Sequence, residues 1–268
     1  MLADTHERAL PDHSGQSNED YLVYLKHMAL YAFVASRVAG KRVLDLGCGE
    51  GYGTESLSQV AQFVVAADYS LDAVTHARKK YARANTAFVV CDAQHLPFAD
   101  SCFQAITTFE VIEHIPDVRG YLEQIKRVCV KPGTIFVSTP NKLLRLLPFQ
   151  KPWNRFHLRE YDARGLMQAM SRVFQRVTML GVTAIPQVLE IEKRRVKQNP
   201  LIAYPRMLAH IVLPSRIYDR LRAIRPGTKE PVSQKTSSQD VGQYSINDFM
   251  VSEKNLSECI NLVAIVEL

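Results

Sequence analysis

Residues 43–54 read Val-Leu-Asp-Leu-Gly-Cys-Gly-Glu-Gly-Tyr-Gly-Thr, an apolar run followed by four glycines at alternate positions. The apolar run predicts a strand over residues 41–46, and a helix is expected from about Thr54 to Val60. Glycine allows a sharp turn between the two and lets a ligand approach the main chain closely. Because ligands of open α/β sheets bind beyond the carboxyl ends of the strands, this turn is the first candidate binding site.

The glycine spacing argues against a dinucleotide. That ligand requires the pattern G-x-G-x-x-G, with its pyrophosphate on the amino end of a helix. If the pattern began at Gly47, its last glycine would be at position 52, which is Tyr52. If it began at Gly49, the last glycine would be at position 54, which is Thr54, so neither frame fits. Asp45, just before the glycines, also suits a ligand with an ammonium group better than one with phosphates.

Strands and helices alternate along the rest of the chain. A helix over residues 19–38, capped by Asn18, precedes the glycine turn. The elements expected after the turn are a strand at 63–67, a helix at 71–81, strands at 87–90 and 103–109, a helix at 118–130, a strand at 134–139, a helix at 161–171 and a strand at 174–180. Segments 244–252 and 260–266 are expected as a closing pair of strands. The alternation predicts an α/β fold with a doubly wound, mostly parallel sheet.

Aspartates stand at the ends of three successive predicted strands. Asp45 ends the first strand, Asp68 ends the second strand 23 positions later, and Asp92 follows the third. A carboxylate at the position of Asp68 can accept hydrogen bonds from both ribose hydroxyls, and Asp92 can accept one from an adenine amino group. S-adenosylmethionine combines a ribose, an adenine, an ammonium and a sulfonium without any phosphate, so the set predicts this cofactor. The alternative is that these aspartates are solvated turn residues.

With these residues in place, the sequence resembles the class I S-adenosylmethionine-dependent methyltransferases over roughly residues 19–180. The blocks that carry the likeness are VLDLGCGEGYGT, VAADYS, CDAQHLPFADSCF, FEVIEHIPD, RVCVKPGTIFVSTPN and NRFHLREYD. Within that superfamily the sequence is similar to bacterial enzymes associated with glycan biosynthesis, through Glu7-Arg-Ala-Leu-Pro11 and Lys26-His-Met-Ala-Leu-Tyr31. The resemblance implies a Rossmann-like sheet of seven strands, with an antiparallel strand among the last two.

The resemblance also implies S-adenosyl-L-methionine as the cofactor and places its parts along the chain. The methionine part is expected at the glycine turn, the ribose at the end of the second strand, and the adenine after the third. The cofactor-binding residues expected on this basis are Asp45, Gly47, Cys48, Gly49, Asp68, Tyr69, Asp92, Ala93 and Phe109. Glu110 is expected beside Phe109, lining the site after the fourth strand.

Four residues are candidates for the chemistry. Glu110, Glu113 and His114 directly follow the fourth predicted strand, and His157 lies in the later block NRFHLREYD. Methyl transfer is an in-line displacement that depends mainly on positioning, but a hydroxyl acceptor must also lose a proton, with help from a base or a metal. We predict His114, His157 and Glu110 as catalytic, with a histidine as the base, and assign no metal ligand. Two alternatives stay open. The Glu-x-x-Glu-His stretch with a later His resembles the metal-binding set of RNA 3′-terminal 2′-O-methyltransferases, and Glu113 with His114 can instead support the turn.

The excess positive charge lies in one segment. The formal net charge is +6, yet residues 191–230 alone carry ten basic and three acidic side chains, a balance of +7. We expect one domain over residues 1–268, divided into an N-terminal helical cap (1–40), a cofactor-binding core (41–182), a basic helical insertion and loop (183–243) and a closing β-hairpin (244–268). The insertion is expected to cover the acceptor. Its mixture of basic and apolar residues suits a glycan or lipid-linked acceptor, a peripheral membrane surface or, as a weaker expectation, nucleic acid; the alternative is a solvated basic face.

Cysteine usage favours the cytoplasm. The five cysteines are odd in number and show no C-x-x-C spacing, which argues against a disulfide framework and a zinc site. No apolar run reaches the roughly 18 residues that span a bilayer. We expect a cytoplasmic enzyme that methylates an oxygen of a small-molecule or glycan-type acceptor. The alternatives are a metal-dependent RNA 3′-terminal 2′-O-methyltransferase and a binding module that kept the fold without catalysis; the oligomeric state is left open.

Overall fold

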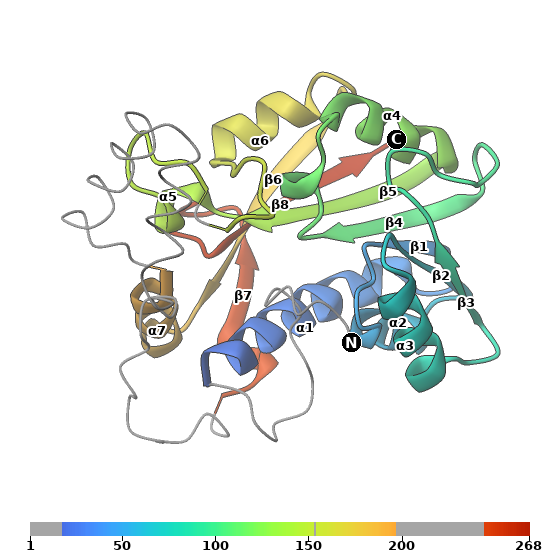
Figure 1. Ribbon diagram of the computed structural model, residues 1–268, viewed down its shortest axis with the longest axis horizontal. Coiled ribbons are helices and arrows are strands. Elements are labelled where there is room, and N and C mark those ends of the chain that lie inside the picture. The colour runs from blue at the N-terminus through green and yellow to red at the C-terminus, as the bar shows by residue number, and fades with distance from the viewer. Residues whose placement is uncertain (1–17, 153, 197–243) are drawn as a thin grey trace, which may run out of the picture.

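A computed structural model of the protein describes residues 18–152, 154–196 and 244–268. Its centre is an eight-stranded sheet with helices on both faces (Figure 1). The elements are α1 (Asn18–Val38), β1 (Arg42–Leu46), α2 (Tyr52–Ser58), β2 (Phe63–Asp68), α3 (Leu71–Tyr81), β3 (Thr86–Val90), β4 (Phe103–Phe109), η1 (Ile112–His114), α4 (Val118–Val128), β5 (Cys129–Pro140), α5 (Lys142–Arg145), α6 (Ala163–Met170), β6 (Val177–Ala184), α7 (Pro186–Val196), η3 (Ile246–Asp248), β7 (Phe249–Ser252) and β8 (Asn261–Glu267).

The strand order puts a switch point next to the glycine turn. The sheet runs β3-β2-β1-β4-β5-β8-β6-β7, and the first five strands in this order are parallel. The chain winds outward from β1 to β3 and then crosses back to place β4 on the other side of β1. Ligands of doubly wound sheets bind at such a point, beyond the carboxyl ends of the strands. The α/β fold with a mostly parallel sheet is thereby confirmed.

Two details of the predicted sheet are wrong. The sheet has eight strands instead of seven, and β7 and β8 do not form a hairpin because β6 lies between them and pairs antiparallel with both. The burial pattern explains this arrangement. Almost every residue of β8 is buried, as expected for a central strand covered on both faces, whereas β7 is short, partly exposed and lies at the sheet edge.

Two layers of apolar side chains cover the sheet. On one face, α4 and α6 contribute buried residues such as Tyr121, Ile125 and Leu166. On the other face, α1, α2 and α7 contribute residues such as Leu22 and Leu57. Helix α4 illustrates how the sequence encodes this packing, because Asp117 caps its amino end through the backbone N–H of Gly120 and apolar residues recur along one side.

The predicted N-terminal cap and basic insertion are described only in part. Helix α1 confirms the helix expected at 19–38, and α7 forms the beginning of the insertion. Residues 1–17 and 197–243 lie outside the described residues, and the second range includes most of the basic residues of the insertion and its expected loop. Within the described ranges, no helix combines the length and apolar character needed to cross a membrane.

Burial of β4 gives a prediction for stability. Ile106 is fully buried in the middle of this strand, so Ile106→Ala should lower the free energy of unfolding by about 2–5 kcal/mol through lost apolar contacts and a residual cavity. Leu71 is 65% exposed, and Leu71→Ala should change the free energy of unfolding by less than about 0.5 kcal/mol. Urea unfolding followed by circular dichroism measures both, and equal effects of the two substitutions would contradict the packing described here.

Candidate functional site

The glycine turn after β1 is fastened to the end of β2. The backbone N–H groups of Gly47 and Cys48 donate to the carbonyl of Ala67 at 2.7 and 3.0 Å. Gly47, Gly49 and Gly51 all have positive φ angles, of 81°, 51° and 89°. This conformation is strained for residues with a side chain, so the glycines predicted from their spacing are required by the backbone.

The same turn packs against the segment that follows β4. A Cβ atom added to Gly47 would lie 2.2 Å from a methyl carbon of Val111, whereas one added to Gly49 would meet nothing within 4 Å. Gly47 therefore faces the protein, and Gly49 faces open space. The turn is closed on the side of η1 and open on the side from which a ligand can approach.

Asp45 joins three elements beneath the turn. It is 1% exposed, and its carboxylate accepts hydrogen bonds from the hydroxyls of Tyr31 and Thr107 at Oδ1 (3.0 and 2.9 Å) and of Thr54 at Oδ2 (2.6 Å). Burial raises the pKa of Asp45, and the three hydroxyls oppose that shift only in part. The carboxylate thus holds α1, α2 and β4 against the end of β1, while its predicted contact with the methionine part of a cofactor stays a prediction.

Asp68 lies at the rim of the open side. Its Oδ2 accepts a hydrogen bond from the backbone N–H of Gly49, and its Oδ1 accepts one from the backbone N–H of Ser70, both at 2.9 Å. The residue is partly exposed, and each carboxylate oxygen can accept a second hydrogen bond. The structure thus brings Asp68 and the glycine turn together, as their positions predicted. The neighbouring Tyr69 is 80% exposed.

Asp92 ends the third strand in a turn of its own. Its carboxylate accepts a hydrogen bond from the backbone N–H of Gln94 at 2.8 Å and lies 3.2 Å from Nδ1 of His95. The hydrogen bond from Gln94 lowers the pKa of Asp92, so the group is ionised at neutral pH. Ala93 is partly buried against the core. Because β3 is next to β2, both residues stand on the same edge of the sheet as Asp68; their predicted contact with adenine stays a prediction.

Glu110 is held in a strained conformation just after β4. Its φ angle is +56°, which is uncommon for a residue other than glycine. The carboxylate accepts hydrogen bonds from Nδ2 of Asn261 and from Oγ of Ser138, and its other oxygen lies 3.9 Å from Nζ of Lys26. Phe109, its neighbour, is 7% exposed and packs edge-on against Tyr31. Strain of this kind concentrates at functional sites.

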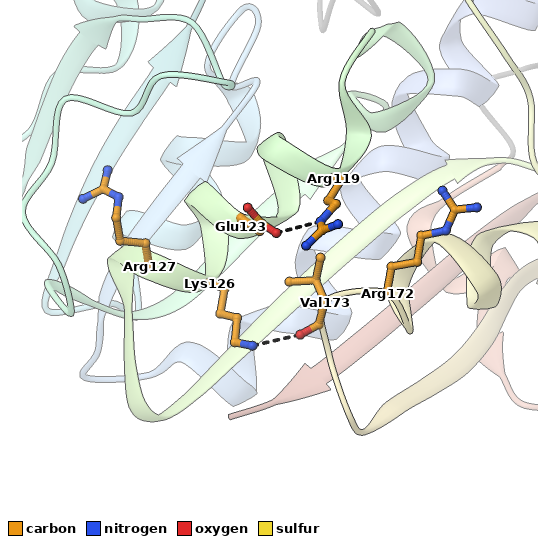
Figure 2. Close-up of a pocket in the computed structure, with 6 residues that line it drawn as sticks. All are labelled: Arg119, Glu123, Lys126, Arg127, Arg172 and Val173. Carbon is orange, nitrogen blue, oxygen red and sulfur yellow. Dashed lines mark hydrogen bonds and ion pairs between the residues drawn. The ribbon is translucent and has the colours of Figure 1, made fainter.

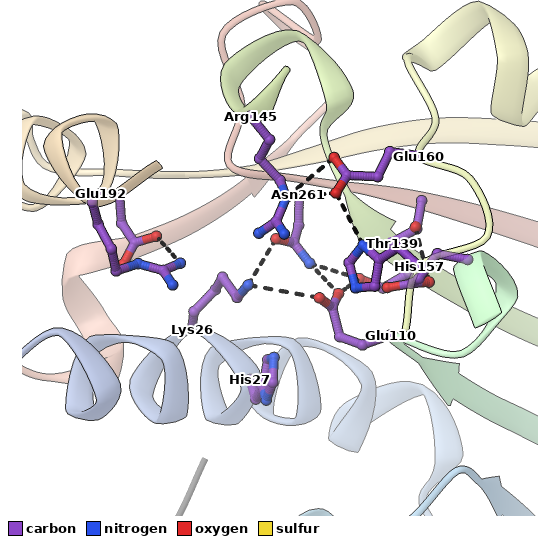
Figure 3. A network of polar contacts seen from close by, with 12 residues as sticks. Lys26, His27, Glu110, Thr139, Arg145, His157, Glu160, Glu192 and Asn261 are labelled. Atoms are coloured by element: carbon purple, nitrogen blue, oxygen red, sulfur yellow. Dashed lines mark hydrogen bonds and ion pairs between the residues drawn. The ribbon is translucent and has the colours of Figure 1, made fainter. Parts of the chain in front are cut away.

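Positive charge surrounds this carboxylate. Burial by itself would raise the pKa of Glu110, but the charges of Lys26 and then Arg145 outweigh burial and hold the pKa below its ordinary value. Figure 3 shows Lys26 on α1 and Arg145 on α5 reaching toward the polar network around Glu110, to which β8 contributes the uncharged Asn261. Glu110 is therefore an ionised group within a buried polar network.

Glu113, His114 and His157 come together beside Glu110. They lie close enough that one ligand-type atom from each falls within 4.8 Å of the others. The backbone N–H of Leu158 donates to the carbonyl of Glu113 at 3.0 Å, which ties the later block to η1. The two imidazole rings are 4.9 Å apart and nearly perpendicular. The sequence offered His114 and His157 as alternative bases, whereas the fold makes them neighbours.

Each member of this cluster is oriented by a further contact. Nδ1 of His114 donates to the carbonyl of Phe156 at 3.0 Å, and Nδ1 of His157 donates to Oε1 of Glu160 at 2.9 Å. Glu113 is fully buried and accepts a hydrogen bond from Thr139 at 3.0 Å. Burial, followed by the nearby charge of Glu110, raises the pKa of Glu113.

Some residues of the network were not predicted from the sequence. Lys26 donates to Oδ1 of Asn261 at 2.8 Å, and both are buried. Lys26 did leave a signal, because it stands one helical turn from Leu22 and Leu30 on the apolar side of α1. Asn261 begins an apolar strand and gave no signal.

A separate hollow of about 490 Å³ lies along α4 (Figure 2). Its lining residues are Arg119, Glu123, Lys126, Arg127, Arg172 and Val173. The cations of α4 already have partners, since Arg119 pairs with Glu123, Lys126 donates to the carbonyl of Val173, and Arg127 pairs with Asp100. The hollow shares no residue with the carboxyl edge of the sheet, and we assign no binding role to it.

Similarity to known proteins points to one reaction. A family of methyltransferase domains matches residues 44–137. A protein of Mycobacterium tuberculosis named probable S-adenosylmethionine-dependent methyltransferase is 33% identical over 195 residues, which cover 72% of this chain and 69% of that protein. A fatty-acid O-methyltransferase of Mycolicibacterium smegmatis is 35% identical over 104 residues, 38% of each chain.

The fold also has counterparts among solved structures. An S-adenosylmethionine-dependent methyltransferase from Thermotoga maritima superimposes with a TM-score of 0.55 and covers 93% of this chain and 95% of its own. At 15% sequence identity, this likeness concerns the fold alone.

The buried His27 gives a pH-dependent prediction. Burial, helped by the charge of Lys26, lowers its pKa from 6.5 to about 4. Between these values the unfolded chain binds the proton and the folded chain does not, so stability falls as the pH drops from 6.5 to about 4. His27→Gln should remove this contribution, roughly 3 kcal/mol over the window. Urea unfolding at several pH values measures it.

The matched control is His76→Gln, because the side chain of His76 is 44% exposed. This variant should keep the pH dependence of the wild-type protein. If His27→Gln kept it too, the neutral state of buried His27 would be refuted.

Proposed function

Because the chain belongs to the class I S-adenosylmethionine-dependent methyltransferases, we propose that it transfers a methyl group to an oxygen atom of a small-molecule or glycan-type acceptor. S-adenosyl-L-methionine is the cofactor of this family. The oxygen and the acceptor class are our proposal.

The residues at the carboxyl edge fit this cofactor. The open side at Gly49 leaves room for the methionine part against the main chain, and Asp68 at the rim has capacity to accept hydrogen bonds from the ribose hydroxyls. Asp92 and Ala93 stand at the next strand end, where we place the adenine. When bound, the cofactor supplies an electrophilic methyl group on a sulfonium. The chain's own task is then to orient that group and to handle the acceptor's proton.

The observation that carries the proposal is the position of the Glu113, His114 and His157 cluster. Val111 packs against Gly47 of the glycine turn, and Glu113 and His114 follow within the next three residues. A hydroxyl acceptor must lose a proton as the methyl group arrives, and this step needs nitrogen or oxygen lone pairs close to the acceptor oxygen. The cluster gathers such groups immediately beside the expected methyl position. That the similar protein from Mycolicibacterium smegmatis is named an O-methyltransferase supports the same choice of atom.

The basic insertion favours an acceptor with anionic or lipid-linked parts. Helix α7 ends in Lys193, Arg194 and Arg195, and the sequence continues with a basic and apolar mixture up to Lys229. Cations interleaved with apolar side chains suit a charged glycan on a lipid carrier, and they also suit contact with a membrane surface. We therefore propose that this segment binds the acceptor, and that the enzyme works in the reducing cytoplasm, with its five cysteines as free thiols.

Asp68 provides a test of cofactor binding. Asp68→Ala should weaken the affinity for S-adenosylhomocysteine by about 1–3 kcal/mol, because a charged hydrogen-bond acceptor for the ribose hydroxyls is lost. Asp72→Ala, which removes an exposed carboxylate from the first turn of α3, should leave that affinity unchanged. Isothermal titration calorimetry measures both. Unchanged affinity in Asp68→Ala would show that the ribose is held elsewhere.

A labelling experiment can identify the acceptor, using S-adenosyl-L-methionine that carries a label on its methyl group. Incubation with cell extract separated into glycan, lipid and RNA fractions should label the glycan or lipid fraction, and mass spectrometry of the product should place the methyl group on oxygen. His157→Gln should lower turnover about 10²–10⁴-fold, with the affinity for S-adenosylhomocysteine within twofold of wild type. Label confined to RNA, or a methyl group on nitrogen or carbon, would overturn the proposal.

A further inference from the structure

We propose that Glu113, His114 and His157 form a binding site for a divalent transition-metal ion of the class of Zn²⁺. The site would lie at the end of β4, next to the expected acceptor. Its purpose rests on the proposed function, but the binding of an ion can be measured without any methyl transfer.

The first observation is the convergence of three ligand types from two distant segments. Glu113 and His114 are in η1 and His157 is in the segment before α6, yet one ligand-type atom from each lies within 4.8 Å of the others. The hydrogen bond from Leu158 to the carbonyl of Glu113 fixes this approach in the backbone. A carboxylate oxygen and two imidazole nitrogens spaced in this way need only small side-chain rotations to reach the distance of about 2 Å at which each would bind one ion.

The second observation is an unsatisfied oxygen inside the cluster. Oε2 of Glu113 accepts the hydrogen bond from Thr139, but Oε1 is buried and has no hydrogen-bond partner among the described residues. Leaving a buried acceptor unpaired destabilises the fold, and more so when the group is charged. A bound cation would satisfy this oxygen directly.

The third observation is the way in which the two histidines are held. A carbonyl and a carboxylate can only accept hydrogen bonds, so Nδ1 carries the hydrogen in both His114 and His157. The ring nitrogen that would bind an ion is therefore Nε2 in each case. Histidines that bind metals are commonly oriented by such a bond from the other ring nitrogen to a carboxylate or a backbone carbonyl.

Glu160, which accepts the hydrogen bond from His157, is held in place by a contact of its own. The side chain of Glu160 is fully buried and lies 3.2 Å from Nε of Arg145 (Figure 3). Glu110, by contrast, directs its oxygens to Asn261, Ser138 and Lys26, so it belongs to the surrounding network and we do not count it as a ligand. The orienting contacts expected around a metal site are thus already in place.

The ligand set indicates the kind of ion. Two imidazoles and one carboxylate suit Zn²⁺, Fe²⁺ or Co²⁺, whereas Mg²⁺ and Ca²⁺ favour sites made of oxygen atoms alone. With three protein ligands, an ion of this class keeps at least one open position. An acceptor oxygen could occupy that position.

The test measures metal binding to the full chain. Protein stripped with a chelator and dialysed is titrated with Zn²⁺ by calorimetry, and Co²⁺ is used in parallel because its visible absorption reports the coordination. We expect each protein chain to bind one equivalent of either ion. Glu113→Gln, which keeps the shape of the side chain and its bond from Thr139, and His157→Gln should each abolish stoichiometric binding. Glu160→Gln should weaken binding about 10–100-fold through loss of orientation.

The matched control is His76→Gln, since His76 is an exposed histidine that also lies near a carboxylate, Glu50. It should bind one equivalent with wild-type affinity. Circular dichroism and binding of S-adenosylhomocysteine establish that each variant is folded. Absence of stoichiometric binding to the wild type, unchanged binding to Glu113→Gln, or loss of binding in His76→Gln would each overturn the proposal.

The two proposals fail separately in this design. Metal binding without S-adenosylhomocysteine binding would support the ion site and contradict the proposed reaction. Binding of S-adenosylhomocysteine without metal binding would leave the reaction standing with His114 or His157 as a metal-free base, and would refute the ion site.

Discussion

The buried carboxylate of Asp45 is the interaction on which the rest of the site depends. A carboxylate that is 1% exposed is tolerated only when its oxygens are well supplied with hydrogen bonds. Here the donors are hydroxyls from α1, α2 and β4, so satisfying one charge fixes three elements around the end of β1. The glycine turn begins two residues later, and its path is therefore set before any ligand arrives.

Close packing connects the glycine turn to the segment that carries the candidate catalytic residues. The absence of a side chain at Gly47 allows Val111 to lie against the turn, and Val111 is followed at once by η1. The cofactor side and the acceptor side of the site are thus neighbours in one packed unit, in which a small displacement of either would disturb the other. Catalysis of an in-line displacement depends on such fixed positions.

The charges around Glu110 have a different role from the cluster beside them. Glu110 sits in a strained backbone conformation and is stabilised by Lys26 from α1 and Asn261 from β8. Strain and burial of this kind persist only where the surrounding structure enforces them. The network therefore joins the first helix and the last strand to the segment after β4, and it supports the position of Glu113 and His114.

The sequence by itself determined the features that depend on local spacing. The positive φ angles of the turn require glycine, the alternation of apolar runs and helical periods predicts a doubly wound sheet, and aspartates at successive strand ends must share one edge of that sheet. Each of these follows from residues close together in the chain. The prediction failed where pairing between distant segments decides the result, as in the expected hairpin of β7 and β8, which β6 separates.

Only the tertiary structure decided which side chains meet. His157 joins Glu113 and His114 because the segment before α6 is hydrogen-bonded to η1. Lys26 and Asn261 are 235 positions apart in the chain, and they meet because α1 packs on one face of the sheet that contains β8. Asp45, expected at the ligand, was found to be enclosed by hydroxyls of its own chain. Such contacts depend on how helices and strands that are far apart in the sequence pack together. Local sequence patterns do not show which distant segments will meet.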